Sequence, residues 1–175
     1  MTYGTPGTFC SRRCHIEIVS LCLFAVIFSS GGCENSSEKH KVPDYPTQPL
    51  PYSGQVRSFT SEACIAPFQI KAAQGSHFLL KLVDSHNKST ALTVFVQGGT
   101  TVNIKAPLGN YEVRYAAGDT WYGDNLLFGP DTSYSKADET FAFRQIGNEV
   151  QGFTITLYKV LHGNLSTSPI DPKQF

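Results

Sequence analysis

Charged residues are scarce in this 175-residue chain. They make up 16% of it, and fourteen basic side chains balance fourteen acidic ones, so the formal net charge is zero. A chain without a basic excess lacks the electrostatic footprint of a nucleic-acid-binding protein. It also lacks the polybasic patch that attaches a protein to anionic lipid. We therefore expect no nucleic-acid partner, and any attachment to a membrane must come from another feature.

Motifs for catalysis are missing as well. The sequence contains no G-x-S-x-G, no His-x-His and no Cys-x-x-Cys spacing. The Gly98-Gly99 pair precedes a strand-like run, whereas a phosphate-binding loop precedes a helix. Nucleophilic catalysis needs a nucleophile, a base and an orienting group, and no such constellation is evident. We expect a protein that is not an enzyme and that carries no cofactor.

The apolar run near the N-terminus is too short to cross a membrane. Residues 19–28 read "VSLCLFAVIF", about half of the roughly 20 residues that a transmembrane helix needs. Arg12 and Arg13 precede the run, and small residues follow it. A basic flank, a short apolar core and small residues are typical of a secretory signal peptide. The sequence therefore predicts a signal peptide over residues 1–32.

The stretch Ser30-Gly31-Gly32-Cys33 ends this signal. It resembles the signal of bacterial lipoproteins, although Ser30 stands where an aliphatic residue is usual. The resemblance implies that Cys33 carries a lipid and is the first residue of the mature protein. It also implies a place in the bacterial cell envelope, anchored to a membrane and facing the periplasm or the exterior. A plain cleaved signal and an uncleaved signal anchor are the alternatives.

Only one cysteine remains for the folded part of the mature protein. Of the five cysteines, Cys10, Cys14 and Cys22 fall within the expected signal peptide, and Cys33 is the expected lipidation site. An exported domain that keeps only Cys64 has no internal disulfide, so its hydrophobic core must stabilise it.

A proline-rich segment follows the signal. Residues 33–53 contain four prolines between Pro43 and Pro51 and show no apolar periodicity. Such a segment favours extended conformations and cannot bury a core. We interpret it as a tether between the membrane and a folded domain.

Residues 54–165 show the alternation of β-strands. Apolar side chains recur at every second position in "HFLLKLVD" (77–84) and "TVNIKA" (101–106), and again in "FTITL" (153–157). A period of two indicates strands with one buried face. Seven or eight such runs at about ten-residue spacing predict an all-β fold, an antiparallel β-sandwich. Residues 166–175 are expected to form a C-terminal tail.

The run "VNIKAPLGNYEVRY" (102–115) places Gly109 and Tyr111 after a strand. It resembles a strand-turn-strand unit of transthyretin-like and carboxypeptidase-regulatory-like sandwiches. That resemblance implies a sandwich, and an immunoglobulin-like topology is equally open.

The longest irregular stretch, residues 118–139, is the candidate binding loop. It contains the single tryptophan of the chain, and aromatic and acidic side chains gather in it. Rings beside carboxylates and amides suit a saccharide or a protein contact. A third interpretation is that Trp121 plugs one end of the sandwich while the acids cap turns. No metal is expected, because the acids are not spaced like a calcium loop. The candidate binding residues are Asp119, Trp121, Tyr122, Asp124, Asn125 and Tyr134.

These features predict a lipid-anchored envelope protein with a non-catalytic β-sandwich. Its role would be to bind an unidentified envelope protein or to serve the structure of the envelope. The alternative is a module that binds carbohydrate or peptidoglycan through the 118–139 loop.

Overall fold

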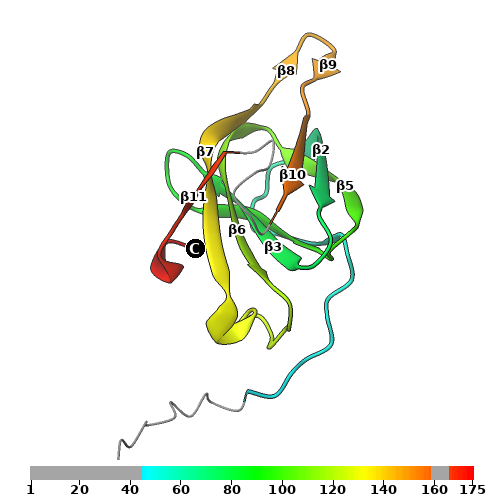
Figure 1. The fold of residues 1–175 in the computed structure, drawn as a ribbon. Coiled ribbons are helices and arrows are strands. Elements are labelled where there is room, and N and C mark those ends of the chain that lie inside the picture. Colours follow the sequence, from blue (N-terminus) through cyan, green and yellow to red (C-terminus); the bar gives the residue numbers. More distant parts are fainter. Residues whose placement is uncertain (1–44, 159–165) are drawn as a thin grey trace, which may run out of the picture. The chain divides into compact units, whose positions relative to one another are not determined.

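The computed structural model describes residues 45–158 and 166–175 (Figure 1). Eleven strands and two short 3-10 turns make up its regular structure, and the described residues include no α-helix. The expected signal peptide, Cys33 and the first part of the expected tether lie outside the described residues. The all-β fold predicted from the alternation is confirmed.

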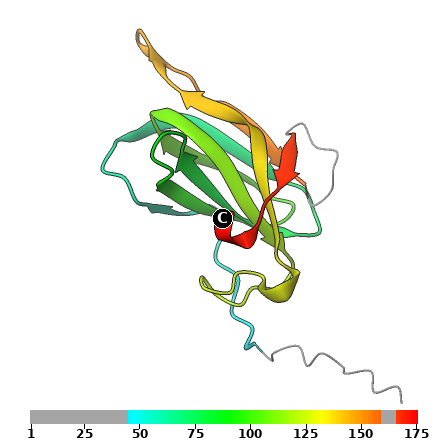
Figure 2. The same cartoon turned by 90° about the vertical axis from the view of Figure 1, so that its left-hand side faces the viewer.

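One sheet has six strands, all paired antiparallel. Their order across the sheet is β1-β4-β3-β6-β7-β11. Figure 2 shows this sheet from the side on which β7 and β11 lie. The strands span Gln55–Ser58 (β1), Thr90–Val96 (β4), His77–Asp84 (β3), Gly109–Gly118 (β6), Ser133–Phe143 (β7) and Thr167–Pro169 (β11).

A three-stranded sheet packs against the first and completes the sandwich. Its order is β10-β2-β5, with β10 at Phe153–Leu157, β2 at Cys64–Ala72 and β5 at Thr101–Pro107. β2 and β5 are antiparallel, whereas β10 joins β2 as a parallel strand. The strands β8 (Gln145–Ile146) and β9 (Glu149–Val150) form a small hairpin that projects beyond the sheets (Figure 1).

The core lies between the two sheets and follows the alternation of the sequence. On β3, Phe78, Leu80 and Leu82 are fully buried, and the residues between them face outward. On β10, Ile155 and Leu157 are buried from the other sheet. Burial of this apolar surface stabilises the fold at roughly 25 cal/mol per Å².

The irregular stretch is shorter than the sequence predicts. β7 begins at Ser133, so the loop between β6 and β7 covers residues 119–132 and contains the 3-10 turn η1 (Gly129–Asp131). The first half of β7 reads "SYSKADE" and shows no apolar alternation. Backbone pairing with β6 makes it a strand, and a register shift between Glu112 and Arg114 accommodates it.

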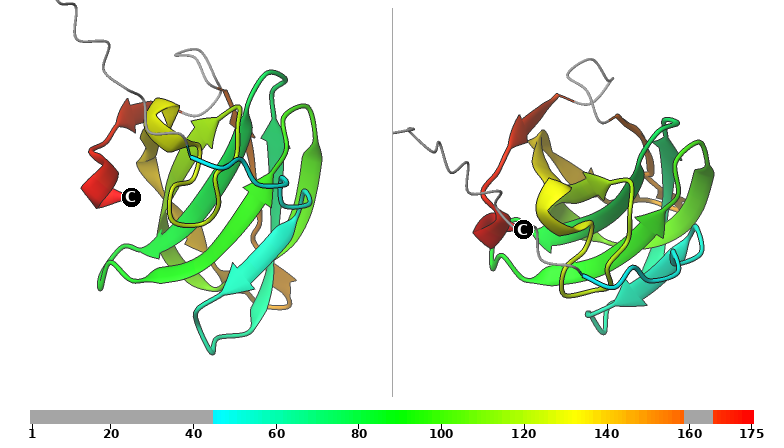
Figure 3. Two further views of the ribbon diagram at one scale, coloured as in Figure 1. Left: turned by 90° about the horizontal axis from the view of Figure 1, so that it is seen from below. Right: turned by 60° about the horizontal axis from the view of Figure 1, so that its bottom comes forward.

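The C-terminal residues are ordered against the sheet instead of forming a free tail. Thr167–Pro169 pairs with β7 as β11, and Ile170 donates its N–H to the Tyr134 carbonyl. The 3-10 turn η2 (Pro172–Gln174) follows, and the Asp171 side chain caps its N-terminus. Figure 3 shows how this segment turns back beside the six-stranded sheet.

The last residues of the expected tether also contact the domain. Gln48 donates its N–H to the Trp121 carbonyl at 2.8 Å, and the Pro51 carbonyl accepts from the Gln97 side chain at 2.9 Å. The segment from Tyr45 to Ser53 therefore lies along the sandwich.

Candidate functional site

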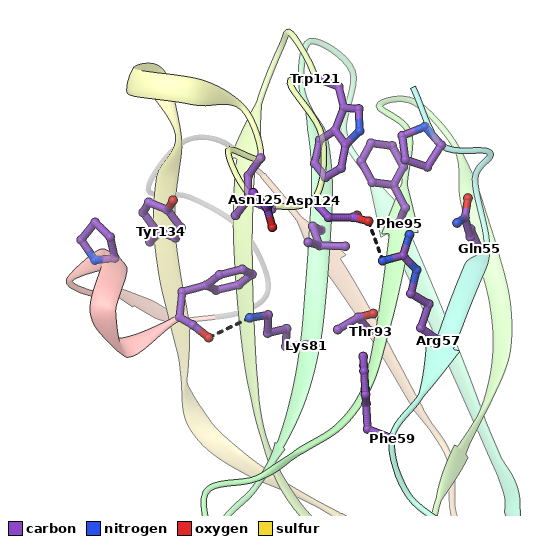
Figure 4. Close-up of a pocket in the computed structure, with 15 residues that line it drawn as sticks. Gln55, Arg57, Phe59, Lys81, Thr93, Phe95, Trp121, Asp124, Asn125 and Tyr134 are labelled. Atoms are coloured by element: carbon purple, nitrogen blue, oxygen red, sulfur yellow. Dashed lines mark hydrogen bonds and ion pairs between the residues drawn. The ribbon is translucent and has the colours of Figure 1, made fainter. Parts of the chain in front are cut away.

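A groove of about 410 Å³ lies on the outer face of the six-stranded sheet (Figure 4). Strands β3 and β4 form its floor with Leu79, Lys81, Thr93 and Phe95. Its other sides come from β1, from the 119–132 loop, from the start of β7 and from the C-terminal segment. With the residues that flank β1, these contribute Pro51, Gln55, Arg57, Phe59, Trp121, Asp124, Asn125, Leu127, Tyr134, Pro172 and Phe175.

The 119–132 loop packs onto the sheet as a small second core. Trp121 is only 4% exposed, and its ring meets those of Phe95 and Phe128 edge-on at 5.2 and 5.3 Å. Gly118 permits this close approach, since a Cβ there would lie 2.2 Å from the Cβ of Phe128. The aromatic side chains of the loop therefore fix it against β4 and β6.

Hydrogen bonds within the loop hold its shape. Tyr122 donates to the Leu127 carbonyl, and Leu127 donates to the Gly123 carbonyl. Leu127 has a positive φ of 52°, an unfavourable conformation for a leucine, and its side chain is buried. Burial of the side chain offsets the cost of this backbone conformation, so the loop keeps a defined shape within the site.

The structure brings together four of the six candidate residues and separates the other two. Trp121, Asp124, Asn125 and Tyr134 all line the groove. Asp119 instead accepts a hydrogen bond from the Ser76 hydroxyl at 2.8 Å. Tyr122 packs edge-on against the ring of Tyr45 at 6.2 Å. Neither Asp119 nor Tyr122 lines the groove.

Several polar side chains of the groove lack hydrogen-bond partners within the described part of the chain. Thr93 is nine-tenths buried, yet its hydroxyl makes no such bond. The amides of Gln55 and Asn125 and the hydroxyl of Tyr134 are also without a partner there. Hydroxyls and amides both donate and accept, so these groups suit a ligand with both kinds of partner.

A row of cations crosses the outer face of the sheet. Strand pairing places Arg57 opposite Thr93 and Thr93 opposite Lys81. The row continues from Lys81 to Arg114 and from Arg114 to Lys136. Residues paired in this way lie on the same face. Four cations therefore lie in one line, although the net charge of the chain is zero.

Acidic side chains neutralise only part of this row. Glu112 forms an ion pair with Arg114 at 2.7 Å, and Asp124 forms one with Arg57 at 2.7 Å (Figure 4). Neither Lys81 nor Lys136 has an acidic partner among the described residues. Like charges opposite each other on adjacent strands destabilise a sheet.

The C-terminal segment supplies oxygen atoms to the same row. Lys81 donates to the main-chain oxygen of Phe175 at 3.0 Å, and its ammonium lies 4.0 Å from the centre of the Phe175 ring (Figure 4). Arg114 donates to the main-chain oxygen of Gln174. The Phe175 ring also packs against Tyr134 at 5.3 Å. A ring and an oxygen acceptor thus already occupy one end of the groove.

The pKa values of Lys81, in the row, and of Glu112, the ion-pair partner of Arg114, are both lowered. Burial lowers the pKa of Lys81 below that of a free lysine, and the nearby charge of Arg114 lowers it further. Burial of Glu112 opposes ionisation, but hydrogen bonds and charge from Lys88 and Arg114 outweigh it and lower the pKa of Glu112. An added anion beside Lys81 would favour its charged form.

Sequence reasoning missed the strand residues of the groove. Gln55, Arg57, Lys81 and Thr93 were not among the candidate binding residues, and Phe175 was placed in the expected C-terminal tail. Alternation marks such residues as outward-facing, but it does not show which outward-facing residues of different strands become neighbours.

Comparison with protein-family models, curated proteins and solved structures gives no match. Among the residues that the structure describes, no helix is long and apolar enough to cross a membrane. The same part of the chain holds no cluster of three metal-ligating side chains.

Proposed function

We propose that this protein is a bacterial envelope lipoprotein whose β-sandwich binds a saccharide without catalysis. The short apolar run that ends at Gly31-Gly32-Cys33 supports the lipid anchor. The groove supports the binding role, and the observation that carries it is the unpartnered hydroxyl of Thr93 on the groove floor. Thr93 lines the groove, and a hydroxyl-bearing ligand there would supply its hydroxyl with a hydrogen-bond partner.

The composition of the groove favours a saccharide over a flat protein contact. Its walls carry amides and hydroxyls from several elements, and aromatic rings lie beside them. Sugars present hydroxyls at their edges and C–H groups on their faces, and aromatic rings suit those faces. A groove of this volume is within the range of sites for small ligands.

A protein partner is the second candidate, and a different surface favours it. Strand β1 is an edge of the six-stranded sheet. Val56 on this strand is 39% exposed, and Tyr52 beside it is 69% exposed. An exposed edge strand can pair with a strand of another chain.

The lipid anchor is tested by substitution of Cys33. Cys33→Ser should abolish incorporation of labelled fatty acid and leave an unprocessed or misplaced precursor. Cys22→Ser, within the apolar run, is the matched control and should be lipidated like the wild type. A Cys33→Ser protein that incorporates fatty acid and fractionates like the wild type would contradict the proposed anchor.

The binding role is tested with purified cell wall and with solubilised envelopes. A saccharide-binding module should sediment with cell wall, and Thr93→Val should reduce sedimentation, whereas Asn103→Ala on the other sheet should not. If a partner protein binds at β1, pull-down from envelopes should instead depend on Val56. Sedimentation that is unaffected by Thr93→Val would contradict saccharide binding in the groove.

A further inference from the structure

The sheet register places positive charge in the groove, although the net charge of the chain is zero. Arg57, Thr93 and Lys81 are successive neighbours across β1, β4 and β3, and all three line the groove. Adjacent strands lie about 4.8 Å apart, so the backbones of Arg57 and Lys81 are separated by about 10 Å. Two cations thus flank one unpartnered hydroxyl.

An apolar row runs beside this cationic row. The same pairings place Phe95 opposite Leu79, Leu79 opposite Ala116 and Ala116 opposite Tyr134. The two rows are two residues apart along each strand, which is about 7 Å. Phe95 and Ala116 are buried beneath the 119–132 loop, whereas Leu79 and Tyr134 are only partly buried. A ligand in the groove therefore meets Leu79 and Tyr134 on one side and cations on the other.

Both cations keep hydrogen-bonding capacity for a ligand. Lys81 uses one donor on the Phe175 oxygen, and an ammonium has three. Arg57 uses one nitrogen on Asp124 and is half exposed. A guanidinium has five N–H donors, so Arg57 can bind a second oxyanion while it retains Asp124.

The contacts of Phe175 show which kinds of group already contact the Lys81 ammonium. Its ring lies against the Tyr134 ring and over the Lys81 ammonium, while its main-chain oxygen accepts from that ammonium. Ring stacking and an oxygen acceptor are thus combined at one lysine. A sugar ring that carries a carboxylate combines the same two features.

We infer that the groove binds an acidic saccharide, a sugar whose carboxylate pairs with Lys81 and Arg57. Its ring lies against Leu79 and Tyr134, and its hydroxyls bond to Thr93, Gln55 and Asn125. The carboxylate neutralises part of a row in which like charges oppose each other. This inference rests on the proposed function, because it specifies the ligand of the same groove.

The test compares two trisaccharides with the same rings. Trigalacturonic acid and its fully methyl-esterified form are titrated into the full-length protein in detergent, and binding is followed by calorimetry. The acid should bind at least about tenfold more tightly than the ester, the usual effect of a charged hydrogen bond. Raising the salt concentration should weaken binding of the acid, because the groove is open to solvent.

Three variants locate the binding. Lys81→Met should weaken binding of the acid by about tenfold or more and leave binding of the ester unchanged. Thr93→Val keeps the side-chain volume and should weaken the binding of both ligands. Lys105→Met, an exposed lysine on β5 of the other sheet, is the matched control and should change neither. Thermal melts of all three verify that each variant is folded.

The outcomes separate this inference from the proposed function. Equal affinity for acid and ester, with sensitivity to Thr93→Val, would overturn the acidic preference and leave saccharide binding in place. Binding of a triglutamate peptide but of neither sugar, with loss in Lys81→Met, would overturn the saccharide and retain an anion site. No binding of any of the three probes would overturn the inference, while sedimentation with cell wall would still test the proposed function.

Discussion

The inner face of the six-stranded sheet is mainly apolar, whereas its outer face places aromatic side chains next to cations. On β3, Phe78 and Leu80 face the other sheet and are fully buried. Their neighbours on the strand, Leu79 and Lys81, face the opposite way and line the groove. The inner face serves folding alone. The outer face keeps charged and unpartnered polar groups beside rings, which suits it to a ligand.

The largest expected effect comes from the inner face. Phe78→Ala should destabilise the protein by about 3–5 kcal/mol, because it removes a fully buried ring that meets Tyr115 edge-on. Chemical denaturation measures this change. Phe59→Ala, at a site 63% exposed, is the control and should change stability by no more than about 0.5 kcal/mol. Similar losses in both variants would show that the two faces do not differ as described.

The outer aromatic cluster should give the next largest effect. Trp121→Ala removes a ring that contacts Phe95 and Phe128 and is 4% exposed. We expect a loss of about 3 kcal/mol, at the low end for tryptophan, because the groove borders one side of the cluster. A thermal melt should show a decrease of about 10 °C.

The same melt decides between two roles of Trp121. A stable Trp121→Ala protein with weakened ligand binding would identify Trp121 as a binding anchor and not as part of a second core. Leu126→Ala is a suitable control, because Leu126 lies in the same loop and is 38% exposed. It should have little effect on the melting temperature.

The inner face was predictable because one signal determines it. Alternation assigns Phe78, Leu80 and Leu82 to the core, and the strand 77–84 appears with the predicted bounds. Alternation was insufficient at β7, where "SYSKADE" is polar and pairing with β6 makes the strand. The 118–139 loop was therefore predicted too long.

The groove was predictable only in its loop. The aromatic and acidic residues of one segment indicated Trp121, Asp124, Asn125 and Tyr134, and all four line the groove. The floor depends on which strands are neighbours. Lys81 and Arg57 are 24 positions apart in sequence, and only the order β1-β4-β3 brings them to the same row. No local pattern carries that information.

A smaller effect is expected from the ion pairs that cover the outer face. Glu112 bonds to both Lys88 and Arg114, and its side chain is 16% exposed. Glu112→Gln should cost about 1–2 kcal/mol at pH 7, because it weakens hydrogen bonds to two charged groups. Chemical denaturation as a function of pH measures the loss.

The contribution of Glu112 to the free energy of unfolding should decrease as the pH falls. The pKa of Glu112 is lower in the folded than in the unfolded protein, so its charge contributes stability above the unfolded pKa of about 4.3. That contribution disappears as the pH falls through the folded pKa. The wild type should therefore lose stability below about pH 4.5 more steeply than Glu112→Gln. Parallel acid limbs for the two proteins would contradict the assignment.

The smallest effect on stability is expected at Arg57, a residue of the outer face. Arg57 and Asp124 are 2.7 Å apart, but their side chains are 51% and 55% exposed. Exposed ion pairs contribute about 0.2–1 kcal/mol, so Arg57→Gln should change stability by less than about 1 kcal/mol. A double-mutant cycle with Asp124→Asn isolates the pair, and its coupling energy should decrease in 1 M salt.

Binding should respond to the same substitution far more than folding does. If Arg57 and Lys81 share an anionic ligand, Arg57→Gln should weaken binding of the acidic trisaccharide by about tenfold while the melting temperature stays nearly constant. Arg144→Gln, an exposed arginine just after β7, provides the matched control and should alter neither quantity. A lower melting temperature for Arg57→Gln would show that this cation stabilises the fold. Binding equal to that of the wild type would show that it does not contact the ligand. The outer row would then lose its role as a binding surface.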